Sequence, residues 1–221
     1  APAGAFLERR LARLLALGDG LAAMALVRAV PDARLDGPRA RAAAEAGLLG
    51  GAVSDTCKRA RRGDLDLADL FWRRLLLACD AIDGHGDRVR LGLDLLRDQG
   101  QDPGADFTRL VEGVAGLGDK PAVAAGSGPI ELALALHGGI PFDAGAVATA
   151  PPGAAAALAR ADSLPPALRL VAAERAAGHG LVDAALLARL YTEIPLPPER
   201  LAEAATAGEN MPGPDGRALL V

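Results

Sequence analysis

The chain has 221 residues, with 28 acidic and 24 basic side chains, and 51% of its residues are hydrophobic while only 3% are aromatic. Ala (50 residues) and Leu (37) far outnumber Val (11) and Ile (4), which favours helices over strands. High apolar content with a net charge of only -4 excludes a disordered chain, and the acidic balance argues against a nucleic-acid partner. We therefore expect an all-α protein.

Helix boundaries are marked throughout by proline at the first helical position and by glycine just past the end. With the apolar periodicity, these signals predict thirteen short helices joined by short connections, which leave no room for a sheet. In chain order the predicted helices span 6–17, 21–30, 38–49, 53–62, 66–82, 87–99, 103–116, 129–137, 143–148, 152–161, 166–177, 181–191 and 198–207.

Three of the connections contain the same Gly-x-Gly pattern, at 18–20, 84–86 and 178–180. Glycine is favoured at the left-handed residue that ends a helix, so this pattern predicts tight αα-hairpins. Hairpins that stack side by side are the unit of α-solenoids. We expect about a dozen short helices in stacked antiparallel hairpins, arranged as a solenoid-like or an irregular multi-helix array.

The stretch 113–159 contains only four charged residues and is rich in Gly, Ala and Pro. Either its neighbours bury it at the centre of the molecule, or it forms an apolar groove or flap that meets a partner. It separates N-terminal hairpins over 1–116 from a second part over 117–221, in which C-terminal hairpins follow the charge-poor segment. One continuous array over both parts is the alternative.

The helix predicted over 66–82 has the clearest amphipathic pattern and holds the only tryptophan. Trp72, Arg73 and Arg74 are candidate interaction residues, because Trp and Arg are enriched at interface hot spots. For Trp72, core packing beside Phe71 is the alternative. In the following helix, Gly92 would allow the two backbones to approach closely.

Cys57 and Cys79 are the only thiols, and both fall on apolar helix faces. If 66–82 is one helix, a tight hairpin separates the two residues by roughly 15 Å along the axis, whereas a disulfide needs Cα atoms within about 7 Å. A bridge therefore requires the residues near 64–68 to be an extended linker. Two buried free thiols and a disulfide both remain open, and a disulfide would indicate an oxidising compartment.

The segment from Cys79 to Pro103, with Gly86-Asp87 at its turn and Asp102-Pro103 at its close, resembles one tetratricopeptide-type helical repeat. Leu91 and Asp98 stand where that family has small residues, and its Trp-Leu-Gly-Tyr pattern is missing. A second hairpin, from Leu168 to Pro195, keeps Ala185 at the small-residue position but ends differently. The resemblance implies a helical-repeat scaffold that binds other proteins, and it carries over no site residue.

The sequence contains no complete catalytic, phosphate-binding or metal-binding motif. His85, His137 and His179 all fall at the C-termini of predicted helices, where the helix dipole favours a partly positive imidazole. No uncharged run is long enough to span a bilayer. We therefore expect no catalytic residue, cofactor or bound metal, no transmembrane segment, and no enzymatic activity.

The favoured function is a non-enzymatic scaffold that mediates protein–protein interaction or assembly, with a partner of unknown identity. The alternative is an all-α domain that binds an apolar small molecule or lipid in a cavity lined by 113–159. The excess of Arg over Lys is typical of a GC-rich genome, and we expect a bacterial protein. A disulfide would place it in the periplasm or outside the cell, and free thiols in the cytoplasm.

Residues 212–221 have the composition of a linker followed by the first turn of another helix, and the chain begins with Ala1. We therefore expect the native chain to be longer, with further helical repeats beyond this segment.

Overall fold

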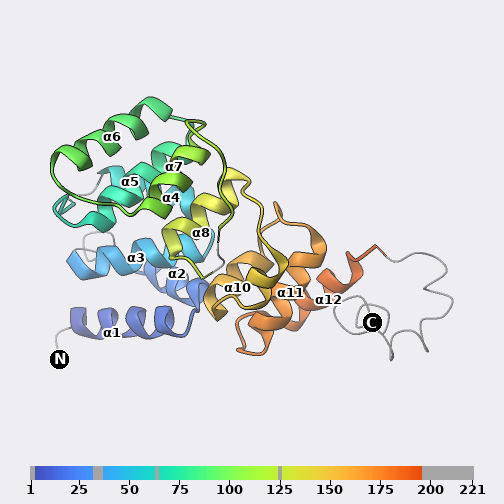
Figure 1. Ribbon diagram of the computed structural model, residues 1–221. Helices are drawn as coiled ribbons and strands as arrows, with labels where there is room; N and C mark the ends of the chain where they lie inside the picture. The colour runs from blue at the N-terminus through green and yellow to red at the C-terminus, as the bar shows by residue number, and fades with distance from the viewer. Residues whose placement is uncertain (1–2, 32–36, 63–64, 124–125, 196–221) are drawn as a thin grey trace, which may run out of the picture.

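The computed structural model describes residues 3–31, 37–62, 65–123 and 126–195 (Figure 1). All regular elements in these ranges are helices, which confirms the predicted all-α class. The twelve helices are α1 (Ala3–Ala16), α2 (Gly20–Arg28), α3 (Gly37–Leu49), α4 (Val53–Arg62), α5 (Leu70–Ile82), α6 (Gly86–Asp98), α7 (Ala105–Val114), α8 (Pro129–Gly138), α9 (Ala144–Ala148), α10 (Pro152–Ala159), α11 (Pro166–Ala177) and α12 (Ala184–Thr192).

These helices follow the predicted ones closely, and the largest shift is at the start of α5. The sequence places that start at Asp66, but the helix begins at Leu70. The Asp66 carboxylate accepts a hydrogen bond from the Ala68 backbone N–H, which holds a turn, and the Asp69 carboxylate caps the helix through the Phe71 N–H. The helix predicted over 198–207 lies outside the described residues.

The three Gly-x-Gly patterns lie between α1 and α2, α5 and α6, and α11 and α12; the first two are tight turns of three residues, and the third belongs to a longer connection over 178–183. In each turn one glycine has positive φ: 79° at Gly18, 76° at Gly84 and 71° at Gly180. This backbone conformation strains residues with a side chain, so glycine is the residue that allows the chain to reverse here.

The N-terminal helices pack as successive antiparallel neighbours. Helices α1, α2 and α3 pack on one another around a small core of their own, and α4 to α7 continue the chain of contacts above them (Figure 1). The buried residues of the small core are Leu11, Ala23, Val27, Ala43 and Ala46. The remaining buried apolar residues form one core that extends into the C-terminal helices.

Helix α8 departs from this nearest-neighbour order. It packs against α3 and α5 as well as against α7, and its residues Ile130 and Leu132 to Ala135 are buried. In a solenoid each repeat contacts only its neighbours, so the array is of the irregular kind. This packing also joins α8 to the N-terminal helices, so the division of the chain at 116/117 does not coincide with a break in packing.

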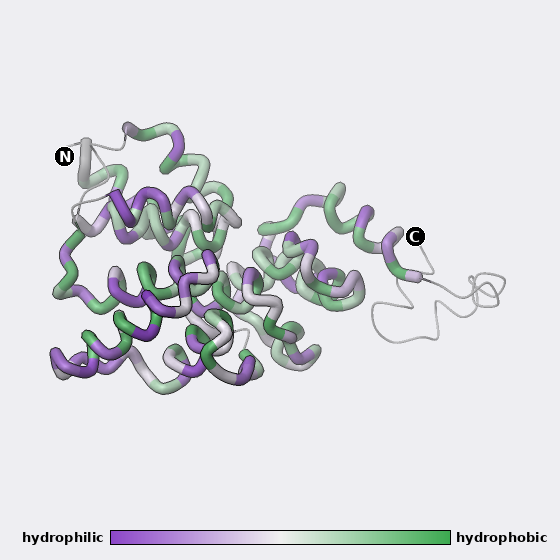
Figure 2. The backbone as a smooth tube through the Cα atoms, turned by 90° about the horizontal axis from the view of Figure 1, so that it is seen from above, coloured by the Kyte–Doolittle hydropathy of each residue, from purple (hydrophilic) through white to green (hydrophobic). Residues whose placement is uncertain are grey.

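Helices α9 to α12 lie beside the N-terminal helices (Figure 1). Within this group, α9, α10 and α12 each pack on α11. In Figure 2 the C-terminal helices form a lobe to one side, in which both hydrophobic and hydrophilic residues occur. Helix α10 consists almost entirely of small residues, and most of them are buried. Burial of α8 and α10 fits the interpretation of 113–159 as a central, covered segment.

A glycine-to-glycine contact joins the two parts of the molecule, namely the N-terminal part with α1 to α8 and the C-terminal part with α9 to α12. A Cβ atom added to Gly18, in the α1–α2 turn, would stand 2.6 Å from the backbone nitrogen of Gly153 in α10. Real Cβ atoms do not approach backbone so closely, so the two chain segments meet here only because neither residue has a side chain.

None of the described helices is long and apolar enough to cross a bilayer.

Candidate functional site

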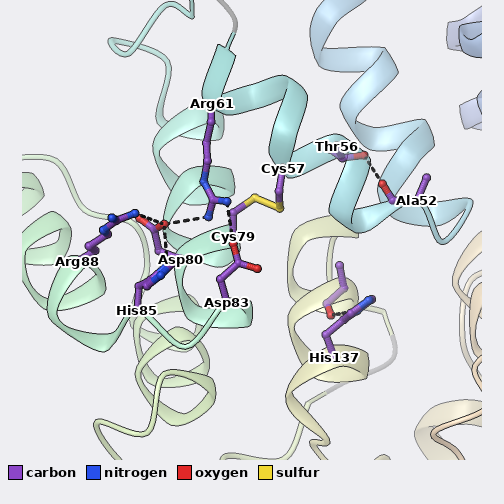
Figure 3. Close-up of a disulfide and its surroundings, with 11 residues drawn as sticks. Ala52, Thr56, Cys57, Arg61, Cys79, Asp80, Asp83, His85, Arg88 and His137 are labelled. Carbon is purple, nitrogen blue, oxygen red and sulfur yellow. Dashed lines mark hydrogen bonds and ion pairs between the residues drawn. A yellow bond between two sulfur atoms is a disulfide. The ribbon is translucent and has the colours of Figure 1, made fainter.

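Cys57 on α4 and Cys79 on α5 are joined by a disulfide, with their Cα atoms 5.6 Å apart and both side chains buried (Figure 3). The late start of α5 makes this possible. Residues 65–69 are not helical, so the offset between the two cysteines along the helix axes falls from roughly 15 Å to about 6 Å. Of the two alternatives, free thiols and a disulfide, the structure therefore contains the disulfide. Residues 65–69 form the non-helical linker that it requires.

Ion pairs surround the disulfide on its exposed side (Figure 3). The guanidinium of Arg61 on α4 lies 3.0 Å from Asp80 and 2.7 Å from Asp83 on α5, and its hydrogen bond with Asp83 is the main cause that raises the Arg61 pKa. Nδ1 of His85 and Nη1 of Arg88 lie within 4 Å of the same Asp80 oxygen. One covalent bond and a charged cluster thus hold α4 and α5 together. The role of these residues is structural.

The predicted interaction residues Trp72, Arg73 and Arg74 do not form one exposed surface. Trp72 is 7% exposed and packs edge-to-face against Phe71, with ring centroids 5.0 Å apart, so it is a core residue. The guanidinium of Arg73 donates to the Leu67 carbonyl and to the Gln99 side chain. That of Arg74 pairs with Glu131.

The Arg74 guanidinium also lies over the Phe107 ring, 4.5 Å from its centroid. It therefore connects α5 with both α7 and α8. Consecutive residues of a helix point in different directions, and only the tertiary structure shows which of them stay exposed.

The outer face of α6 carries two exposed leucines, Leu91 (71% exposed) and Leu95 (50%), one helical turn apart. Arg88 precedes them by three residues and Asp98 follows them by three, and both are exposed. Buried Val89, Leu93 and Leu96 occupy the opposite face, which packs on the neighbouring helices. We call the row Arg88, Leu91, Leu95 and Asp98 the α6 seam.

A cleft of about 320 Å³ opens where the end of α3, the start of α4 and the ends of α8 and α10 meet. We call it the four-helix cleft. Its wall is mainly apolar, and its polar side chains are His137, Arg160, Asp162 and Ser163. Four of its residues, Ala133, Leu136, His137 and Ala157, belong to the charge-poor segment 113–159.

The histidines are dispersed. Nδ1 of His137, in the last turn of α8, lies 3.0 Å from the Ala133 carbonyl oxygen. His85 stands at the N-cap position of α6, directly after α5, and its side chain makes no capping bond. In the ranges that the structure describes, no three His, Cys, Asp or Glu side chains are grouped so that they could hold a metal ion.

The chain matches no family model, no curated protein and no solved structure. The tetratricopeptide resemblance of residues 79–103 therefore stays a prediction. Leu91 and Asp98, the two positions that depart from that family's pattern, both belong to the α6 seam.

The sequence did not predict the α6 seam. Of the four-helix cleft it predicted only that residues of 113–159 would line a cavity in the alternative function. The α6 seam had a visible signal, namely exposed-face leucines flanked by opposite charges at three-, four- and three-residue spacing. The other residues of the four-helix cleft had no signal, because they come from the ends of helices that are distant in sequence.

Proposed function

We propose that this chain is an assembly module, and that it pairs with a second copy of itself through the α6 seam. The observation that supports the proposal is the symmetry of the seam. Leu91 and Leu95 lie equally far from Leu93 along the helix, and so do Arg88 and Asp98. A second copy of the row that runs in the opposite direction therefore places a leucine opposite each leucine and a charge of opposite sign opposite each charge.

Two α6 helices can pack in antiparallel orientation, related by a two-fold axis at the level of residue 93. This arrangement brings complementary residues together. Leu91 of one copy then faces Leu95 of the other, and Arg88 faces Asp98. Each contact occurs twice, as in any interface that uses the same patch on both subunits. The two leucine pairs lose water, and the two ion pairs flank them and fix the register.

Both charged ends of the seam are accessible for such pairing. The Arg88 side chain is 64% exposed, and among the residues that the structure describes its only ion pair is a long contact of 3.9 Å with Asp80. Asp80 also has Arg61 at 3.0 Å, so it does not depend on Arg88. Asp98 forms no hydrogen bond or ion pair with another residue that the structure describes.

A contact along a single helix of about 20 Å buries less surface than the roughly 1,600 Å² of a standard interface. We therefore expect weak association, with a dissociation constant in the micromolar range. Such contacts suit an assembly in which several weak interfaces act together. This is the scaffold function expected from the helical hairpins, with the partner now specified.

The test is a charge exchange, measured by sedimentation equilibrium over a micromolar concentration series. R88D alone and D98R alone each oppose like charges in both symmetric pairs, and we expect each to weaken dimerisation at least about tenfold. The double variant R88D/D98R restores opposite charges in the reversed sense, and we expect it to recover most of the affinity.

L91S/L95S removes the apolar centre of the seam and should leave the protein monomeric. Leu17, in the α1–α2 turn, is 67% exposed and distant from α6 along the chain, so L17S is the matched control and should dimerise normally. Circular dichroism confirms that each variant is folded. A monomeric wild-type protein, or single charge variants that associate as the double variant does, would contradict the proposal.

A further inference from the structure

Arg160 is a half-buried cation, and no carboxylate of the described residues is in contact with it. It is the C-cap residue of α10, where its Nη1 donates to the Ala156 carbonyl at 2.8 Å and its Nη2 donates to the Leu181 carbonyl at 2.6 Å. Its five N–H groups include three that these bonds do not use. None of the ion pairs within the described part of the chain involves it.

Arg169, nine residues later, shows how this protein treats a buried guanidinium elsewhere. Its side chain is 7% exposed and is paired with Asp162 at 2.9 Å and with Glu193 at 3.0 Å. Two carboxylates therefore balance its charge, as burial of a cation requires. Arg160 lies in the same region without such a counter-charge.

The surroundings of Arg160 disfavour its charge. Burial lowers its pKa, and the carboxylates of Asp183 and Asp19 offset this only in part and from a distance. Both carboxylates accept hydrogen bonds from the first turns of their own helices, α12 and α2. A negative group brought directly to Arg160 would therefore gain a partner that the protein itself does not provide.

The four-helix cleft, which Arg160 lines, has the form of a small-molecule site. Its volume of about 320 Å³ lies within the range of ligand pockets, and Leu48, Val53, Ala133 and Ala157 supply apolar wall. Asp162 also lines it, but this carboxylate is already engaged by Arg169. Among the side chains that line the cleft, Arg160 thus combines unused N–H donors with a positive charge that no described carboxylate contacts.

We infer that the four-helix cleft binds a small carboxylate with an aliphatic chain, the carboxylate on the Arg160 guanidinium and the chain against Leu48, Val53 and Ala133. This site is separate from the α6 seam. The charge-poor segment 113–159 helps to line it. Because the cleft is open to solvent on one side, ligand entry needs no rearrangement of the helices.

The test uses three probes with the same eight-carbon chain and different head groups: octanoate, 1-octanol and octylammonium. Each is titrated into the disulfide-intact protein by calorimetry, and binding is located by methyl and amide chemical-shift changes. We expect octanoate to bind in a one-to-one complex at least about tenfold more tightly than either other probe, with shifts at Val53, Ala133 and Ala157.

R160Q removes the charge and keeps a similar polar chain, and we expect it to weaken octanoate binding at least about tenfold while 1-octanol binding stays unchanged. R189Q is the matched control, because Arg189 is exposed on α12 and does not line the cleft. A157F fills the cleft and should abolish binding of all three probes. The dimerisation variant L91S/L95S should bind octanoate normally, which separates this test from that of the seam.

Tighter binding of octylammonium would show that the carbonyl-rich helix ends of the cleft, rather than Arg160, determine its preference. That result overturns the inference. Equal octanoate affinity of R160Q and the wild-type protein, or no octanoate binding by the folded wild-type protein, also overturns it.

Discussion

The two parts of the molecule stabilise neighbouring helices in different ways. In the N-terminal part, α4 and α5 are joined by the buried Cys57–Cys79 disulfide, and the Arg61 ion pairs lie beside it at the surface. In the C-terminal part, the buried Arg169 holds the end of α10, α11 and the C-cap of α12 together through Asp162 and Glu193. No disulfide occurs among the described residues of α9 to α12.

The difference follows from the side chains available in each part. Helix α10 consists almost entirely of Ala and Gly, so contacts between its side chains and α11 bury little area per residue. A long arginine with two carboxylates can connect three segments across the gaps that small side chains leave. Helix α5 has larger apolar residues, and its covalent bond to α4 restricts the unfolded chain as well.

The largest expected effect comes from removing the disulfide. C57A/C79A should lower the free energy of unfolding by about 3 kcal/mol, because the bridge closes a loop with a sequence separation of 22 in the unfolded chain. Urea unfolding followed by circular dichroism measures it. If the two parts unfold separately, only the N-terminal transition should shift; an unchanged midpoint would show that the bridge adds no stability.

The C-terminal counterpart is the Arg169 network. R169A should lower the free energy of unfolding by about 2 kcal/mol, because it removes both ion pairs and the packing of a buried side chain. R169M keeps most of the packing volume and should cost about half as much. Because Asp162 and Glu193 remain partly exposed, neither is left as a buried charge. Equal losses in the two variants would show that charge, rather than packing, is what Arg169 contributes.

The third expected effect, no larger than that of R169A, concerns the contact between the two parts. G18A should lower stability by about 2 kcal/mol, from left-handed strain of about 1 kcal/mol and the clash with Gly153. G84A is the matched control, since Gly84 has a similar φ of 76° and an added Cβ would meet nothing within 4 Å. The difference between the two variants measures the contact alone. If G18A costs no more than G84A, the α1–α2 turn and α10 separate easily.

The helices were predictable because their signals are local. Proline at N1 begins α8, α10 and α11 as the sequence predicted, and one glycine of each Gly-x-Gly turn has positive φ. The start of α5 was wrong by four residues because the carboxylates of Asp66 and Asp69 bond to nearby N–H groups and stop the helix. Side-chain capping of this kind competes with helix propensity, and propensity alone does not predict the outcome.

The candidate sites were less predictable, since each depends on exposure. Trp72 and Leu91 are both large apolar residues on amphipathic helices, yet Trp72 is 7% exposed and Leu91 is 71% exposed. Helix α5 is covered by α4, α6, α7 and α8, whereas the outer face of α6 has no helix over it. The number of helices that cover a face is a property of the packing, which the periodicity of one helix does not contain.

The amino-acid sequence by itself determined the all-α class, the order and approximate bounds of the helices and the positions of the tight turns, because Ala, Leu, Pro and Gly act on the backbone within a few residues. Only the tertiary structure decided that α8 packs back on α3 and α5, that Cys57 reaches Cys79, and that Arg160 lines a cleft in which no described carboxylate pairs with it. These features join residues far apart along the chain. They depend on interhelical angles and close approaches such as that of Gly18 and Gly153, which no local pattern specifies.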